Sequence, residues 1–255
     1  MRCTFLGHST LLIESGGSAI LTDPLLTDRI LMKRRAAPLG VPVAALPPLT
    51  AITISHAHAD HLHLPSLKLL PREATLVVPA GVGRFVKKLG FAAVRELAWD
   101  GRLELGAFTV TAIPVNHVRG RFFPWQDTGV NSYVIDDGVH AFFAAGDVDF
   151  GPAPELAALA DRFQLAAAAL PVGGMREVAY YVKRRGKKAV HIDPATAWEL
   201  FLQTGARMMV PIHWGAVRMA TTPLDEPVAA VLEAARAHQM ADRVRALAPG
   251  EVWDL

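Results

Sequence analysis

The sequence contains little cysteine and almost no net charge. Cys3 is the single cysteine among 255 residues, so an intramolecular disulfide and a metal site built from cysteines are both excluded. Lysine and arginine number 26 against 24 for aspartate and glutamate, and this formal net charge of +2 disfavours a nucleic-acid partner. Because 51% of the residues are hydrophobic, the composition excludes disorder as the main character of the chain.

Long apolar runs are missing as well. No run approaches the length needed to cross a bilayer, so we predict no transmembrane segment. The first residues carry Gly7, His8 and Glu14 where a secretory signal needs an unbroken apolar stretch, which predicts a cytoplasmic location. A chain of 27.5 kDa can bury a sizeable core, and no repeat or linker divides it. We therefore expect one domain over residues 1–255.

Predicted strands and short helices alternate along the chain. Apolar or alternating runs predict strands at 2–6, 10–14, 19–22, 51–54, 75–78, 103–105, 108–113, 131–135, 140–144 and 207–212. Helices are predicted at 65–70, 81–89, 154–163, 194–204 and 227–238, whereas residues 165–170 fit a buried strand or a helix equally well. A proline-rich loop spans 23–50, and whether it forms a lid is left open. The pattern predicts an α/β or α+β class with layered sheets.

The segment with the clearest chemistry is Ser-His-Ala-His-Ala-Asp-His at residues 55–61. It directly follows a predicted strand, where a rigid element can present a loop of ligands. His56 and His58 are two residues apart, so in an extended backbone both point to the same side. Asp60 and His61 follow as the chain turns and can face a second point nearby. Imidazole and carboxylate groups without thiolates suit zinc, manganese or iron.

Three more candidate ligands follow other predicted strands. They are His117, Asp147 in Ala-Gly-Asp, and His213 in Ile-His-Trp-Gly. Together with the four side chains of the first segment they provide seven nitrogen or oxygen ligands. That number is enough for two metal ions that share one carboxylate.

The order of these ligands resembles the metallo-β-lactamase superfamily. Further motifs resemble its N-acylphosphatidylethanolamine phospholipase D branch, which is related to the ascorbate-phosphate lactonases. They are Gly-His-Ser-Thr at 7–10, Thr-Asp-Pro at 22–24, Leu-Pro-Pro at 46–48, His-Ile-Asp-Pro at 191–194 and Ile-His-Trp-Gly at 212–215. The resemblance extends from Leu6 to about Gly215. It implies a four-layer αβ/βα sandwich with a metal site along one edge.

The resemblance also implies a role for each candidate. The first metal would be held by His56, His58 and His117, the second by Asp60, His61 and His213, with Asp147 bridging. The ions would be two divalent metals, with zinc expected first and manganese or iron as alternatives. Asp23 would orient a ligand imidazole, and His8 would be a buried supporting residue. Asp60 and His191 are the candidate catalytic residues. His191 would lie at the mouth of the site, where it could orient the substrate or protonate the leaving oxygen.

Two cations that share a water lower its pKa towards neutrality and generate a hydroxide nucleophile. We therefore expect a binuclear hydrolase acting on a phosphodiester or ester-like bond of a small anionic or lipid substrate. One alternative is a lactonase acting on a phosphorylated sugar acid. An alternative of another class is a di-iron redox or oxygen-reactive metalloprotein. Peripheral contact with a membrane is compatible with all of these, and the oligomeric state is not predicted.

Two basic segments are candidates for binding the substrate. The candidate side chains are Arg119, Arg121, Phe123, Trp125 and Arg184. Arginine suits a phosphate, and the aromatic rings suit an acyl chain. The sequence also departs from the phospholipase branch, because Asp147 is followed by Val-Asp-Phe where that branch typically has Thr-Gly-Tyr. Asp149 is therefore an additional acid near the expected metals, and the sequence assigns it no role.

Overall fold

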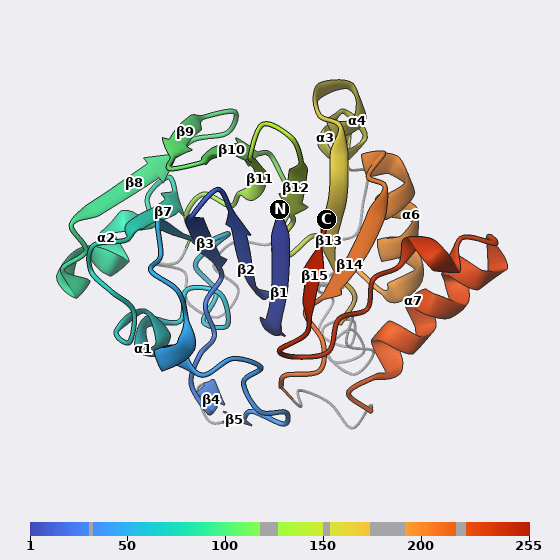
Figure 1. The fold of residues 1–255 in the computed structure, drawn as a ribbon, viewed down its shortest axis with the longest axis horizontal. Helices are drawn as coiled ribbons and strands as arrows, with labels where there is room; N and C mark the ends of the chain where they lie inside the picture. Colours follow the sequence, from blue (N-terminus) through green and yellow to red (C-terminus); the bar gives the residue numbers. More distant parts are fainter. Residues whose placement is uncertain (31–32, 118–126, 150–153, 174–191, 218–222) are drawn as a thin grey trace.

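Two β-sheets form the centre of the computed structural model, which describes residues 1–30, 33–117, 127–149, 154–173, 192–217 and 223–255 (Figure 1). The seven-stranded sheet has the order β15-β1-β2-β3-β6-β7-β8, and the six-stranded sheet has the order β14-β13-β12-β11-β10-β9. The first contains β1 (Arg2–Gly7), β2 (Thr10–Ser15), β3 (Ser18–Thr22), β6 (Ala51–Thr53), β7 (Thr75–Pro79), β8 (Ala93–Leu97) and β15 (Val252–Asp254). The second contains β9 (Arg102–Leu105), β10 (Phe108–Ile113), β11 (Ser132–Asp136), β12 (Ala141–Ala144), β13 (Leu165–Pro171) and β14 (Met208–Ile212). A separate pair, β4 (Arg29–Ile30) and β5 (Lys33–Arg34), lies at the lower edge in Figure 1.

Short helices cover the outer faces of both sheets. On one side lie α1 (Leu64–Leu67) and α2 (Gly83–Val86); on the other lie α3 (Pro154–Ala157), α4 (Leu159–Arg162), α6 (Pro194–Thr204) and α7 (Glu226–Ala237). Single turns of 3-10 helix occur at η1 (Val43–Ala45), η2 (Lys87–Leu89) and η4 (Ala241–Arg243). None of the helices in the described ranges is long and apolar enough to span a bilayer.

The apolar side chains sort into three core layers. Alternate residues of β1 show how, because Phe5 joins the layer between the two sheets whereas Leu6 joins the layer beneath α1 and α2. The third layer lies between the six-stranded sheet and α6, where Trp198 and Phe201 are buried. Three apolar layers separate four layers of secondary structure, so the predicted four-layer sandwich is confirmed.

The segment at 165–170, which fits either a strand or a helix in sequence, is the strand β13. It pairs in parallel with β12 on one side and β14 on the other, and every one of its residues is buried. A strand buried on both faces has no polar alternation, which is why its alanine-rich sequence was ambiguous. The helix predicted at 154–163 is instead divided into α3 and α4, and the edge strands β8 and β15 were not predicted.

Asp137, at the turn between β11 and β12, ties this hairpin to the other sheet. Its carboxylate accepts hydrogen bonds from the Ser15 hydroxyl (2.6 Å) and the His140 backbone N–H (2.7 Å). The amino group of Met1 lies 3.7 Å away. Burial disfavours the ionised carboxyl, but these contacts outweigh it and hold the pKa of Asp137 below its ordinary value.

Asp137→Asn is expected to lower the free energy of unfolding by about 1–2 kcal/mol at pH 7, because charge-assisted hydrogen bonds are lost. Because the pKa of Asp137 is lower in the folded than in the unfolded chain, its ionised carboxylate stabilises the fold above about pH 4. This stabilisation is lost as the pH falls through the folded-state pKa. Urea unfolding at pH 7 and pH 3 should therefore show the gap between wild type and variant shrinking at pH 3. An equal gap at both pH values would contradict this assignment.

Candidate metal centre

The predicted ligands follow the carboxyl ends of strands at one edge of the two sheets. In the seven-stranded sheet β1, β3 and β6 run in the same direction, and in the six-stranded sheet β10, β12 and β14 do. His8 follows β1, Asp23 follows β3, His56 to His61 follow β6, His117 follows β10, Asp147 follows β12 and His213 follows β14. Rigid strands therefore present all of these side chains on short loops.

The first cluster consists of His56, His58, His117 and Asp147, all buried. His58 Nδ1 lies 2.8 Å from His56 Nε2 and 3.1 Å from His117 Nε2. Asp147 Oδ2 lies 3.7 Å from both of those Nε2 atoms. Four ligands bonded to zinc at about 2.0–2.1 Å in a tetrahedron are about 3.4 Å apart, so these atoms fit one divalent ion.

The second cluster consists of His8, Asp60, His61 and His213. Asp60 Oδ2 lies 3.1 Å from His8 Nε2, 3.5 Å from His213 Nε2 and 3.9 Å from His61 Nε2. Nitrogen and carboxylate donors again converge without a thiolate, which suits a borderline metal ion. The structure thus contains two candidate metal-binding clusters side by side.

Asp147 lies between the two clusters. Its Oδ2 faces the first, whereas its Oδ1 lies 3.3 Å from His61 Nε2 and 3.4 Å from His213 Nε2 in the second. One carboxylate therefore presents one oxygen to each cluster. This is the arrangement that a shared ligand requires.

Burial and neighbouring charges set the protonation of the ligands. Burial, followed by the neighbouring imidazoles, holds the pKa of His56 well below its ordinary value. Burial and then His213 lower the pKa of His8 to about 4, although Asp60 opposes them. Both imidazoles are therefore neutral at pH 7. A metal ion requires this form of its histidine ligands.

Carboxylates have the opposite effect elsewhere in the site. Burial lowers the pKa of His61, but Asp147, Asp23 and Asp60 outweigh it and raise that pKa well above its ordinary value. Burial also opposes ionisation of Asp60, yet His61 and hydrogen bonds from His213 and His8 hold its pKa well below the ordinary value. The carboxylates thus favour the charged form of His61, whereas burial keeps His56 and His8 neutral.

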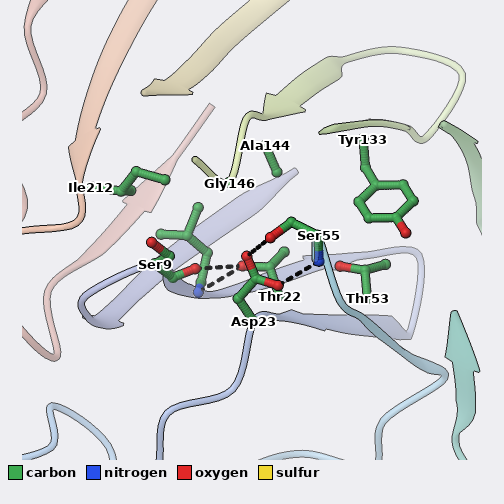
Figure 2. Close-up of a pocket in the computed structure, with 10 residues that line it drawn as sticks. Ser9, Thr22, Asp23, Thr53, Ser55, Tyr133, Ala144, Gly146 and Ile212 are labelled. Carbon is green, nitrogen blue, oxygen red and sulfur yellow. Dashed lines mark hydrogen bonds between the residues drawn. The ribbon is translucent and has the colours of Figure 1, made fainter. Parts of the chain in front are cut away.

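Asp23 is hydrogen-bonded to Ser55 (Figure 2) and in turn holds His61 in place. Asp23 Oδ1 accepts a hydrogen bond from the Ser55 backbone N–H, and Oδ2 accepts one from the Ser55 hydroxyl, both at 2.7 Å. His61 Nδ1 lies 2.8 Å from Asp23 Oδ2, so the ring presents Nε2 to the cluster. Sequence reasoning assigned no role to Ser55, although its place directly before His56 in the motif is the signal for one.

His8 lies closer to the candidate ligands than the sequence suggested. Its carbonyl oxygen accepts a hydrogen bond from the His213 backbone N–H at 2.8 Å, and the two ring centroids are 4.1 Å apart. Both residues have left-handed backbones, with φ of +58° and +62°. Non-glycine residues persist there only where the surrounding structure fixes them, typically at functional sites. The second cluster therefore offers four side chains of its own, where three were expected.

The remaining candidates cannot be placed. Arg119, Arg121, Phe123, Trp125, Arg184 and His191 lie outside the described residues.

Comparison with known proteins identifies the family. Residues 18–214 match the model of a family described as the beta-lactamase superfamily domain. The chain belongs to the metallo-β-lactamase superfamily. It is 32% identical over 248 residues to an uncharacterized protein of Mycobacterium tuberculosis. The alignment covers 92% of this chain and 64% of that protein. It therefore spans about two thirds of the length of that relative.

Two further proteins are similar to this chain, one in sequence and one in structure. N-acyl-phosphatidylethanolamine-hydrolyzing phospholipase D 1 of Caenorhabditis elegans is 28% identical over 240 residues, covering 86% of this chain and 65% of that protein. A crystal structure of isothiocyanate hydrolase from Delia radicum gut bacteria superimposes with a TM-score of 0.79 at 16% identity, covering 100% of this chain and 99% of the other. The second likeness shows that the fold is shared.

Proposed function

We propose that the chain is a binuclear metal-dependent hydrolase that cleaves a phosphodiester or another ester-like bond in a small anionic or lipid substrate. The observation that carries the proposal is Asp147, whose two oxygens face different clusters at 3.3–3.7 Å. Similarity to a phospholipase D that hydrolyses an N-acylated phospholipid supports the choice of a phosphodiester.

In this proposal each cluster holds one ion, with zinc expected first. His56, His58 and His117 hold the first, Asp60, His61 and His213 hold the second, and Asp147 contributes to both. Two such ions supply Lewis-acid charge and activate water for attack on phosphorus or a carbonyl carbon. Asp23 keeps the Nε2 of His61 directed into its cluster, because its own carboxylate accepts the hydrogen bond from Nδ1.

A cavity lined by three arginines and one aspartate supports an anionic substrate. The cavity has a volume of about 500 Å³, and its lining includes Arg29, Arg34 and Arg35. Arg29 and Arg34 are direct partners across β4 and β5, an arrangement of like charges that an anion would stabilise. A Cβ atom on Gly7 would lie 3.0 Å from the Arg35 guanidinium, so Arg35 lies against the residue that precedes His8.

The first test is metal content together with hydrolysis of bis(p-nitrophenyl) phosphate. We expect about two zinc or manganese ions per chain. His58→Ala should lose at least one ion and lower turnover by about 10²-fold or more, because each ion stabilises the negative charge of the transition state by several kcal/mol. His238→Ala, at the C-terminus of α7, is the matched control and should keep both ions and full turnover. Two irons without phosphodiesterase activity would overturn the hydrolase and favour the redox alternative.

A substrate screen then separates the remaining classes. N-acylated phospholipids in vesicles and phosphorylated lactones should be offered at equal concentration. Turnover of the phospholipid with a kcat/KM above that for the lactone supports the proposal and implies contact with a membrane surface. Turnover of the lactone alone would replace the phosphodiesterase by the lactonase.

A further inference from the structure

Asp149 contacts a ligand of the first cluster, although the sequence assigned it no role. Its Oδ1 lies 2.8 Å from His117 Nδ1, and both side chains are buried. The Asp149 backbone N–H also donates a hydrogen bond to the Asn116 carbonyl oxygen at 3.0 Å. The loop that follows β12 is thereby joined twice to the loop that follows β10.

This contact determines which nitrogen of His117 is free to bind a metal ion. A carboxylate accepts a hydrogen bond, so Nδ1 carries the proton and Nε2 keeps its lone pair. Nε2 is the atom that faces the cluster, 3.1 Å from His58 Nδ1 and 3.7 Å from Asp147 Oδ2. Without the carboxylate the proton could reside on either ring nitrogen, and the ring would be held less firmly.

The second cluster contains a matching pair. Asp23 Oδ2 lies 2.8 Å from His61 Nδ1, and His61 Nε2 faces Asp147 Oδ1 at 3.3 Å. Each cluster thus has one imidazole supported by a carboxylate on its far side. The two supported imidazoles face different oxygens of the shared Asp147.

We propose that Asp149 is a positioning residue that fixes the ring and the tautomer of His117 and so sets the affinity of the first cluster for its ion. The proposal rests on the metal centre described under Proposed function. Supporting partners of this kind change metal affinity by about 10–100-fold.

The test measures the dissociation constants of both ions by competition with a chromogenic zinc chelator. Asp149→Asn should raise the dissociation constant of one ion by about 10–100-fold and leave that of the other unchanged. In a His117→Ala background the same substitution should have no further effect on either constant. In a His213→Ala background it should weaken binding of the remaining ion as much as it does in the wild type. Asp161→Asn, on the exposed face of α4, makes the same chemical change away from the clusters and should alter neither constant.

Any one of three results would overturn the proposal. The first is that Asp149→Asn binds both ions as tightly as the wild type does. The second is that Asp149→Asn still weakens ion binding in the His117→Ala background, and the third is that it weakens the binding of both ions equally because the metal-free protein is less stable to urea. Failure of the metal centre itself is distinguishable, because the wild type would then hold fewer than two ions whatever residue is at 149.

Discussion

Replacing Asp147 by alanine is expected to remove both ions and to lower phosphodiester hydrolysis by about 10³-fold or more. The reason is geometric, since one oxygen of Asp147 lies within 3.3–3.4 Å of two imidazoles of the second cluster and the other lies 3.7 Å from two of the first. Metal content after gel filtration and turnover of bis(p-nitrophenyl) phosphate check the expectation.

Asp254→Ala is the matched control for this variant, because Asp254 is exposed at the sheet edge in β15. It should retain both ions and normal turnover. If Asp147→Ala kept two ions at wild-type affinity, the shared-carboxylate arrangement would be wrong. Loss of a single ion would instead restrict Asp147 to one cluster.

Gly146→Ala is expected to lower the free energy of unfolding by about 2–4 kcal/mol, which is the largest stability effect that we expect. Gly146 has a φ of +65°, and a Cβ atom there would lie 2.5 Å from the Ser55 Cβ atom and 2.7 Å from its hydroxyl oxygen. Ser55 cannot move away cheaply, since its backbone and its hydroxyl both hold Asp23. Urea unfolding of the metal-free protein measures the loss, and metal affinity should fall with it.

Gly138→Ala separates the two causes of this effect. Gly138 has a similar φ of +83°, but a Cβ atom there would meet nothing within 4 Å beyond its chain neighbours. Its substitution should therefore cost only the backbone conformational term, about 1–2 kcal/mol. Equal losses in the two variants would show that the contact with Ser55 does not matter.

The candidate metal centre could be predicted in large part because its residues are concentrated in one short motif or follow recognisable strands. The structure brings all seven predicted ligands together in two adjoining clusters. Their identity as ligands stays a prediction until metal binding is measured. Sequence reasoning assigned His8 a supporting role, but its position among the ligands, like the roles of Ser55 and Asp149, depends on contacts between segments that are distant in sequence.

The limits of the fold prediction have a similar origin. Runs such as Phe108–Ile113 were predicted with their exact bounds, since a hydrophobic run between turn residues is a local signal. The strands β8 and β15 were not, because each is a partly exposed sheet edge defined by its partner. Whether residues 165–170 form a strand or a helix is likewise decided by tertiary structure, because β13 pairs with a parallel strand on each side.

The two clusters also differ in how much of the chain the ribosome must release before they can assemble. Every side chain of the first, with the Asp149 that supports it, is translated before residue 150. The second joins His8, near the beginning, to His213, and a backbone hydrogen bond connects those two residues directly. Because chains are synthesised from the N-terminus and distant contacts form late, the second cluster is completed last. A nascent chain that stops short of residue 213 therefore carries the ligands for only one complete cluster.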